Sequence, residues 1–495
     1  MSNKELSSAL GSAARGASLF AVGRISKNFI GFGINFLLTN LLGPLGYGIF
    51  TYANSLVLFA LNVADFGTDK AMVRFLPEYL DDKWEQERFL GMAVYSAFAA
   101  SMLVSVLMYI FAPLISSYTL SEKSFIFALR VLAFILPFKA LTRVIQNTFR
   151  ALNFPKYQLG LSELLEPLSR LVAVGMATVL GLAVEGTVTA ILIGSILLFT
   201  IAGSLLFHQL DIRPRLTADK QKLTRFYRYT APLTLSSAGS SITTRIDVFI
   251  IGFFLSGASI GFYRVAALLS MLIALPLNGL NQLFPPQASA MYAENRLEDL
   301  ENYYKSVTRW SLTATLPVAV GIIVYRKELL VLFGGSFVVA QMIVVVLALN
   351  ELIKAAAGPC GTLLMMTDHQ LITMVNNWGL GIFNLVLNIV FIQEFGLIGA
   401  AIATLISASI FNVLKLLEVW YYEGMSPYSR NYYKPIVAII VCYSVMRIVS
   451  EVTDGLPLAI VGGFLGVIFF LVTLYVLGVE DSDKTLLKQI GVNIV

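Results

Sequence analysis

The sequence predicts an all-α protein that crosses a membrane many times. Only 13% of its 495 residues are charged, whereas soluble globular domains carry about 25%. Apolar runs of about 20 residues, each long enough to cross the hydrocarbon core of a bilayer, recur from one end to the other. A closed barrel, the other structure that spans a bilayer, needs short alternating strands, and these runs are long and continuous. The bilayer is therefore the expected solvent of this chain.

Hydropathy predicts about fourteen membrane-spanning helices, separated by short loops. We expect them at residues 17–40, 46–66, 89–113, 124–150, 158–182, 187–208, 230–254, 258–283, 308–325, 337–363, 371–393, 396–419, 433–450 and 456–478. Connections as short as LGPLGYG after the first span and LSGASIGFYR after the seventh indicate antiparallel helix hairpins.

The charges in the loops predict the orientation. Alternate loops are rich in Lys and Arg, above all the stretch DIRPRLTADKQKLTRFYRYT that joins the sixth and seventh spans, and the remaining loops hold few cations. By the positive-inside rule the basic loops and both termini face the cytoplasm. The first 16 residues lack the apolar core of a cleavable signal peptide, so we expect the first span to direct insertion into the cell membrane.

Two segments of the chain resemble each other. NLLGPLGYGIFTYANSL at 40–56 is similar to FFLSGASIGFYRVAALL at 253–269, and this alignment places Gly48 opposite Gly261. Halves of six spans related by such an offset have the same orientation and typically hold a site between them near the middle of the membrane. Chance similarity between apolar segments is the alternative.

The repeat predicts three parts of the chain. We expect an N-terminal lobe with a basic cytoplasmic linker, then a C-terminal lobe, then two further spans with a cytoplasmic tail: 1–228, 229–420 and 421–495. The two lobes of six helices would be pseudo-symmetric.

Charged residues inside the apolar runs are the candidates for a functional site, because a charge at the centre of a membrane helix costs roughly 2.5–3.5 kcal/mol. In the first span Arg24 and Lys27 are three residues apart and share one face of the helix. Two interpretations are open: the side chains line a polar cavity, or they extend along the helix to reach the headgroups.

The fourth and fifth spans carry charges at helical spacing. Lys139 and Arg143 are four residues apart, shortly after Pro137, which predicts a kink. The fifth span has three charged residues on one face: Glu163, Glu166 and Arg170. An ion-pair network between the two helices and a cavity lined by these cations are both consistent with the pattern, since the carboxylates would hold the cations in place.

Later spans add further intramembrane charges. Arg245 and Asp247 interrupt the seventh span, where Arg245 is a candidate cavity residue and Asp247 a candidate for ion coupling. Arg264 lies in the eighth span, as a contact on the outer side or an interfacial residue. Glu351 and Lys354, three apart in the tenth span, are placed to pair with each other.

The balance of these charges favours an anionic ligand. The candidate cations for a substrate-binding cavity outnumber the acids: they are Arg24, Lys27, Lys139, Arg143, Arg170, Arg245, Arg264 and Lys354. The acids are Glu163, Glu166, Asp247 and Glu351, and the first three are the candidates for ion coupling. An excess of cations suits a phosphate-bearing headgroup, which the planar fork of Arg fits particularly well. An exporter of cationic drugs is expected to show the opposite excess.

Several motifs together resemble the polysaccharide-flippase branch of the multidrug/oligosaccharidyl-lipid/polysaccharide (MOP) exporter superfamily. They are LTNLLGPLGYGIF, DFGTDKAMVRFLPEY, FRALNFPKYQ and TRIDVFIIGFFLSGASIGFYRVAALL, and the layout of twelve core spans plus two covers nearly the whole chain. The resemblance implies a two-lobed transporter with alternating access. It implies a cargo of lipid-linked oligosaccharide, on a polyprenyl (pyro)phosphate, that moves from the cytoplasmic to the outer leaflet for glycan biosynthesis.

Other classes of function are less well supported by the sequence. We expect no enzyme and no cofactor, because there is no nucleotide motif and no loop longer than about twenty residues. Two Cys and two His residues give no metal pattern, and the basic loops report topology rather than a nucleic-acid partner. The alternatives are a cation or drug antiporter of the same superfamily and a flippase of the peptidoglycan lipid precursor. Membrane lipids, H+ or Na+, and a polysaccharide polymerase or glycosyltransferases are the other expected partners.

Overall fold

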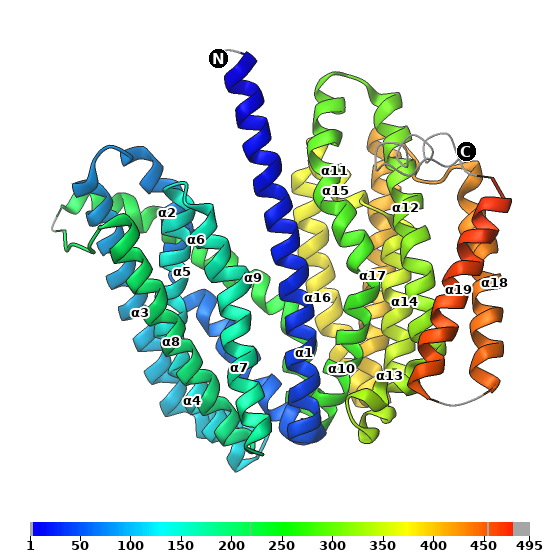
Figure 1. Cartoon of the computed structure of the whole chain (residues 1–495), viewed down its shortest axis with the longest axis horizontal. Coiled ribbons are helices and arrows are strands. Elements are labelled where there is room, and N and C mark those ends of the chain that lie inside the picture. The colour runs from blue at the N-terminus through cyan, green and yellow to red at the C-terminus, as the bar shows by residue number, and fades with distance from the viewer. Residues whose placement is uncertain (1–2, 218, 453–454, 479–495) are drawn as a thin grey trace. The chain divides into compact units, whose positions relative to one another are not determined.

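The computed structural model describes residues 3–217, 219–452 and 455–478, and the side chains of residues 26–217, 219–234, 237, 245–451 and 455–478. Within these ranges the chain is built of helices and contains no strand (Figure 1). Ten helices there are long and apolar enough to cross a membrane, or eleven if one pair bent by 52° forms a single span. The predicted class, an all-α polytopic membrane protein, is confirmed, whereas the count of fourteen spans is not.

The chain divides into two compact units, Met1–Gly261 and Phe262–Val495, and the lobe boundaries expected from the sequence stay predictions. The first unit contains α1 (Asn3–Ala64), α2 (Thr68–Phe75), η1 (Leu76–Tyr79), α3 (Lys83–Tyr118), α4 (Lys123–Ala133), α5 (Ile135–Ala151), α6 (Pro155–Leu159), η2 (Gly160–Leu165), α7 (Glu166–Val179), α8 (Val184–Leu210) and α9 (Lys220–Phe254). Helix α10 (Gly257–Ile273) begins at the end of this unit.

The second unit continues with α11 (Leu275–Ala293), α12 (Leu297–Val324), α13 (Arg326–Leu332), η3 (Gly335–Ala340), α14 (Gln341–Ala357), α15 (Cys360–Met366), α16 (Gln370–Phe395), α17 (Leu397–Glu423), η4 (Arg430–Tyr432), α18 (Tyr433–Val452) and α19 (Leu456–Val476). Within it α14 packs against α12 and α17, α16 against α17, and α18 against α19. The consecutive pairs, α16 with α17 and α18 with α19, are antiparallel neighbours that follow from the short loops between their helices.

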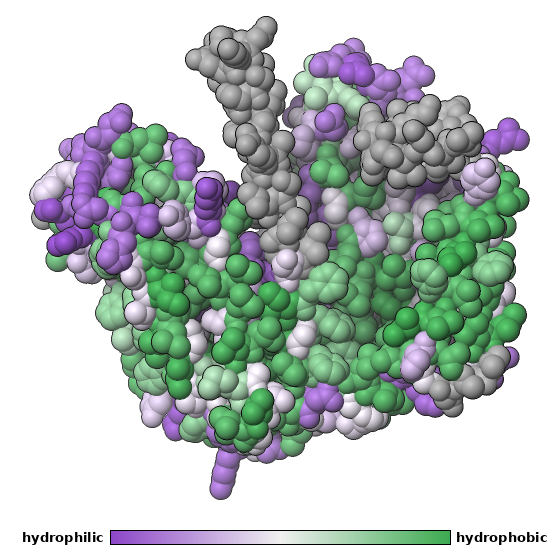
Figure 2. Space-filling model, in the orientation of Figure 1, coloured by the Kyte–Doolittle hydropathy of each residue, from purple (hydrophilic) through white to green (hydrophobic). Residues whose placement is uncertain are grey.

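The first unit is a bundle in which α5 packs against α3 and α8, and α7 packs against α8 and α1 (Figure 1). Large apolar side chains point outward from these helices: Leu103 is 61% exposed and Ile110 60%. Figure 2 shows apolar residues over the middle of the bundle and hydrophilic ones at its ends. This distribution is typical of helices whose outer faces contact lipid.

The predicted kink of the fourth span is a break between α4 and α5 at Phe134. Pro137 has no N–H, so the carbonyl of Ala133, four residues earlier, loses its helical donor. The hydroxyl of Ser105 on α3 donates to this carbonyl at 2.8 Å instead. The break therefore leaves no unsatisfied carbonyl at Ala133 and ties α5 to α3.

Two glycines that the predicted repeat aligns, Gly48 and Gly261, both lie at close backbone contacts in the first unit. A Cβ on Gly48 would lie 1.7 Å from the carbonyl oxygen of Gly257, and a Cβ on Gly261 would lie 2.3 Å from that of Pro44. Pro44 and Gly257 are aligned by the same offset, so the two contacts are reciprocal, as mates across a two-fold axis are. The repeat stays a prediction that this reciprocity supports.

Candidate functional site

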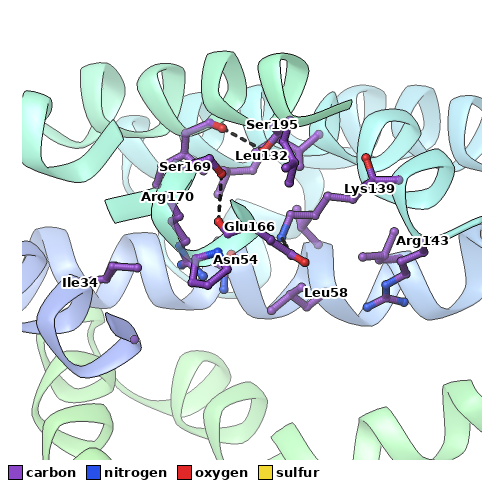
Figure 3. A pocket seen from close by; sticks show the side chains of 18 of the residues that line it. Ile34, Asn54, Leu58, Leu132, Lys139, Arg143, Glu166, Ser169, Arg170 and Ser195 are labelled. Atoms are coloured by element: carbon purple, nitrogen blue, oxygen red, sulfur yellow. Dashed lines mark hydrogen bonds and ion pairs between the residues drawn. The ribbon is translucent and has the colours of Figure 1, made fainter. Parts of the chain in front are cut away.

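A cavity of about 210 Å3 lies inside the first unit, among α1, α5, α7 and α8 (Figure 3). Four of the cations that the sequence singled out line it: Lys27, Lys139, Arg143 and Arg170. They come from three different helices, which explains why their convergence is not visible in the spacing of any one span. The carboxyl group of Glu166 lies on the same wall.

Lys139 and Glu166 join α5 to α7 across the cavity. Figure 3 shows the two side chains pointing toward each other, and the Nζ of Lys139 lies 3.4 Å from Oε1 of Glu166. The ion pairing expected between the fourth and fifth spans is thus present. The Lys139 side chain is 24% exposed and that of Glu166 36%, so the pair remains accessible from the cavity.

Lys27 is held by an irregular turn that the sequence did not predict. The backbone between Gly160 and Leu165 is a π-helical turn, in which each carbonyl bonds to the N–H five residues on. For Ser162 that partner is Pro167, which has no N–H. The Nζ of Lys27 donates to the carbonyl of Ser162 at 3.0 Å instead, and it lies 3.6 Å from Oε2 of Glu163.

Arg143 binds two side chains at the end of α1. Its guanidinium donates to Oδ2 of Asp65 at 3.0 Å and to Oδ1 of Asn62 at 3.0 Å. The Asp65 side chain is only 5% exposed, so this carboxylate depends on Arg143 for its charge balance. Asp65 was missed as a site residue. The signal was a carboxylate within the motif DFGTDK, directly after an apolar run.

Arg170 completes the wall on α7, where its guanidinium lies 5.6 Å from the centre of the Phe50 ring. Among the described residues that line the cavity the cations outnumber the acids, because Glu166 is the one acid there. The carboxylates of Glu163 and Asp65 pair with Lys27 and Arg143 from beside the cavity. A small or phosphate-sized anion suits this balance, whereas a further cation does not.

The other predicted site residues lie elsewhere. Arg245, on α9, donates to the hydroxyl of Ser55 at 3.5 Å, and Asp247 is half-buried two residues further along. Arg264 is half-buried on α10. On α14 the Nζ of Lys354 lies 2.8 Å from Oε1 of Glu351, the pair that their spacing predicted.

One predicted cation falls outside this description. The side chain of Arg24 lies outside the residues whose side chains the structure describes. Its place in a cavity stays a prediction, as do the roles of the residues in α9, α10 and α14. Uncharged polar side chains also line the cavity, and in the sequence they look like ordinary polar residues of a helix: Asn54, Thr142, Gln146, Ser169 and Ser195.

Two proteins that are similar to this chain are named for roles in the biosynthesis of glycans. The chain is 23% identical over 398 residues to the probable low-salt glycan biosynthesis flippase Agl15 of Haloferax volcanii, covering 78% of this chain and 80% of that protein. It is 21% identical over 313 residues to the teichuronic acid biosynthesis protein TuaB of Bacillus subtilis, covering 62% of each.

Solved structures share the fold. The lipid II flippase MurJ in an inward closed conformation matches with a TM-score of 0.74 at 16% identity, over 95% of this chain and 99% of that one. An inward-facing multidrug resistance transporter of the MATE family, in the MOP superfamily, matches with a TM-score of 0.66 at 16% identity, over 82% and 98%. At this identity the likeness concerns the fold.

The match that decides the family covers residues 13–291, more than half of the chain, and this family is described as polysaccharide biosynthesis protein. The resemblance to polysaccharide-exporting membrane proteins that the motifs suggested is confirmed by this family match, and the solved structures confirm the expected fold. The chain is a multi-span membrane protein that belongs to the polysaccharide biosynthesis protein family, and it has the fold of the MOP-superfamily transporters.

Proposed function

We propose that this protein flips a polyprenyl-(pyro)phosphate-linked oligosaccharide from the cytoplasmic to the outer leaflet by alternating access. One observation carries the proposal: four cations converge on a cavity inside the bundle of the first unit, and Glu166 is the one acid among its described lining residues. Such a cavity stabilises phosphate oxygens through charge-assisted hydrogen bonds. The family and the named relatives support a glycan as the rest of the cargo.

The size of the cavity limits what it holds. About 210 Å3 accommodates a phosphate-sized group, whereas pockets for whole drug-sized ligands measure about 300–1,000 Å3. We therefore assign to it the charged group that every lipid-linked sugar shares, and not the sugar. This assignment predicts tolerance toward different oligosaccharides on the same polyprenyl pyrophosphate.

The direction and the driving force are parts of the same proposal. With the basic loops and both termini in the cytoplasm, the lipid-linked sugar enters from the side where it is made. An H+ or Na+ gradient resets the transporter, with Glu163, Glu166 or Asp247 as the coupling carboxylate. Arg24, Arg245, Arg264 and Lys354 remain candidate contacts for the substrate outside the cavity. A polysaccharide polymerase or glycosyltransferases are the proposed functional partners.

A second function, flipping of the peptidoglycan lipid precursor, is favoured by the match to the solved lipid II flippase over 95% of this chain. Both functions need the cationic cavity and differ in the sugar. A cation antiporter, by contrast, is disfavoured by the positive balance of the cavity.

Transport in proteoliposomes tests these functions side by side. The purified protein is reconstituted with a fluorescent polyprenyl-pyrophosphate oligosaccharide, with a fluorescent peptidoglycan precursor, or with a fluorescent organic cation under an H+ or Na+ gradient. The account predicts movement of the oligosaccharide lipid and none of the cation. Movement of the precursor alone would support the second function, and movement of the cation alone would contradict both.

A pair of variants tests the cavity in the same assay. Arg170→Gln removes a cation from the cavity wall, and we expect transport of the pyrophosphate lipid to fall about tenfold or more. Arg130→Gln is the matched control, because Arg130 contacts the ring of Tyr109 on α3, outside the cavity. Equal transport by the two folded variants would refute the phosphate assignment.

A further inference from the structure

A second charged site lies outside the cavity, in an open groove of about 680 Å3 between α2 and the first turns of α9. Its walls carry four cations, and no carboxylate is among its described lining residues: the cations are Arg74, Lys220, Arg225 and Arg228. Figure 2 shows hydrophilic side chains gathered at the end of the first unit that carries α2.

Helical spacing creates the wall on α9. Lys220, Thr224 and Arg228 follow each other at intervals of four residues and so share one face, with Arg225 beside them. The groove also has aromatic walls. The rings of Phe75 and Tyr229 are 5.3 Å apart, and the guanidinium of Arg225 lies 5.0 Å from the centre of the Phe75 ring.

The charges of the groove are only partly compensated. Glu78 pairs with both Arg74 and Arg225, and its Oε2 lies 2.7 Å from the NH2 of Arg225. Lys220 and Arg228 make no ion pair with any residue that the structure describes. One carboxylate therefore faces four cations, so the described residues of the groove and Glu78 together carry a net charge of three positive at an exposed site.

The two walls are joined to each other before any ligand binds. Glu78, directly after α2, links Arg74 to Arg225 on α9. The Nζ of Lys70 on α2 also donates to the hydroxyl of Ser237 on α9 at 2.7 Å. These contacts fix the spacing of the cations, so little ordering is needed when a ligand enters.

We infer that this groove binds the phosphate headgroup of an anionic phospholipid. Arginine and lysine held together in this way suit phosphate oxygens, and basic residues next to a membrane helix attract anionic lipids. Apolar surface for the lipid lies close in the chain, since Leu80, two residues after Glu78, is 51% exposed. The inference does not depend on which substrate the protein transports.

Binding to the full-length protein in detergent tests the inference. Native mass spectrometry titrates short-chain phosphatidylglycerol, phosphatidylcholine of the same chain length, and glycerol phosphate. We expect phosphatidylglycerol to bind and the double variant Lys220→Gln/Arg228→Gln to bind it about 30-fold more weakly. The control Arg150→Gln/Lys156→Gln removes two exposed cations of the same unit outside the groove and should change binding less than about twofold.

The opposite change gives a second, independent readout. Glu78→Gln removes the negative charge that neutralises Arg74 and Arg225 but keeps an amide oxygen that accepts hydrogen bonds from them, and it should bind phosphatidylglycerol about fivefold more tightly. Equal weakening by the two double variants would show a general charge effect and overturn the site. Phosphatidylcholine binding as tightly as phosphatidylglycerol would overturn the role of the charge. Glycerol phosphate binding as tightly would assign the groove to a soluble phosphate and overturn the lipid.

Discussion

Two Lys–Glu pairs, one in each unit, show how the same residue types serve different purposes. In the first unit Lys139 and Glu166 lie on different helices, α5 and α7, on the wall of a cavity. In the second unit Lys354 and Glu351 lie three residues apart on α14. A pair along one helix neutralises charge for insertion into the membrane. A pair between helices also fixes how the helices pack.

The other charges of the cavity follow the pattern of the first pair. Lys27 on α1 meets Glu163 in the π-helical turn, and Arg143 on α5 meets Asp65 at the end of α1. Three ion pairs therefore cross between segments around one small space. The surplus of cations is visible in the sequence. The comparison shows that these cations form a site where carboxylates from other segments of the chain pair with them.

The largest effect should come from breaking the cavity pair that has the most buried carboxylate. Asp65→Asn leaves the guanidinium of Arg143 without its carboxylate, and we expect it to destabilise the protein by about 3 kcal/mol, because an uncompensated charge is costly away from water. Thermal unfolding of the purified protein measures the loss. Glu351→Gln, in the pair on one helix, is the control and should cost about 0.5 kcal/mol or less. Equal losses of stability in the two variants would contradict the distinction between pairs that join two segments and pairs within one helix.

A smaller effect is expected for the two lysines. Lys139→Gln should destabilise the protein by about 1 kcal/mol, and Lys354→Gln by about 0.3 kcal/mol. Double-mutant cycles with Glu166→Gln and Glu351→Gln separate the coupling of each pair from other consequences of the substitutions. If the coupling energy of Lys354 and Glu351 is as large as that of Lys139 and Glu166, then linking two helices adds nothing to the strength of an ion pair.

The sequence selected residues that line the cavity, but it did not predict how these residues are held in place. Helical spacing and the cost of membrane charges were enough to select Lys27, Lys139, Arg143 and Arg170, all of which line the cavity. The partner of Arg143 could not be predicted, because Asp65 lies 78 residues away in the chain and no local pattern joins them.

The backbone irregularities were only half predictable. Pro137 indicated a kink, and the break occurs three residues before it, where the structure places the Ser105 hydroxyl on the freed carbonyl. Pro167 also lies inside an apolar run, but the π-helical turn before it binds Lys27 from α1, and this tertiary contact is not encoded in the sequence spacing.

The smallest effect is expected for an ion pair that joins two segments of the chain but is exposed to solvent. This pair separates the effect of joining segments from the effect of burial. Lys83 and Asp211 also join two segments, α3 and the loop after α8, but both side chains are exposed, and their atoms lie 2.7 Å apart. The hydrogen bond from Lys83 lowers the pKa of the Asp211 carboxyl. A lowered pKa gives stabilisation that is present above the usual value of about 3.9 and is lost as the pH falls through the folded-state value.

For that exposed pair we expect Asp211→Asn to lower Tm by about 1 °C or less at pH 7. The difference from the wild-type protein should shrink as the pH is lowered below about 4. Thermal unfolding over a pH series measures both. A fall in Tm as large as that of Asp65→Asn would mean that joining two segments, without burial, determines how much an ion pair stabilises the protein.

The central claim is that a cation of the cavity both holds the helices and binds the phosphate of the cargo, and Arg143 tests it most directly. The double variant Arg143→Gln/Asp65→Asn removes both charges of the pair and should fold with nearly wild-type stability. The account predicts that this variant, reconstituted in proteoliposomes, transports the polyprenyl-pyrophosphate oligosaccharide about tenfold more slowly or worse. Transport at the wild-type rate would show that Arg143 serves the fold alone and would contradict the account.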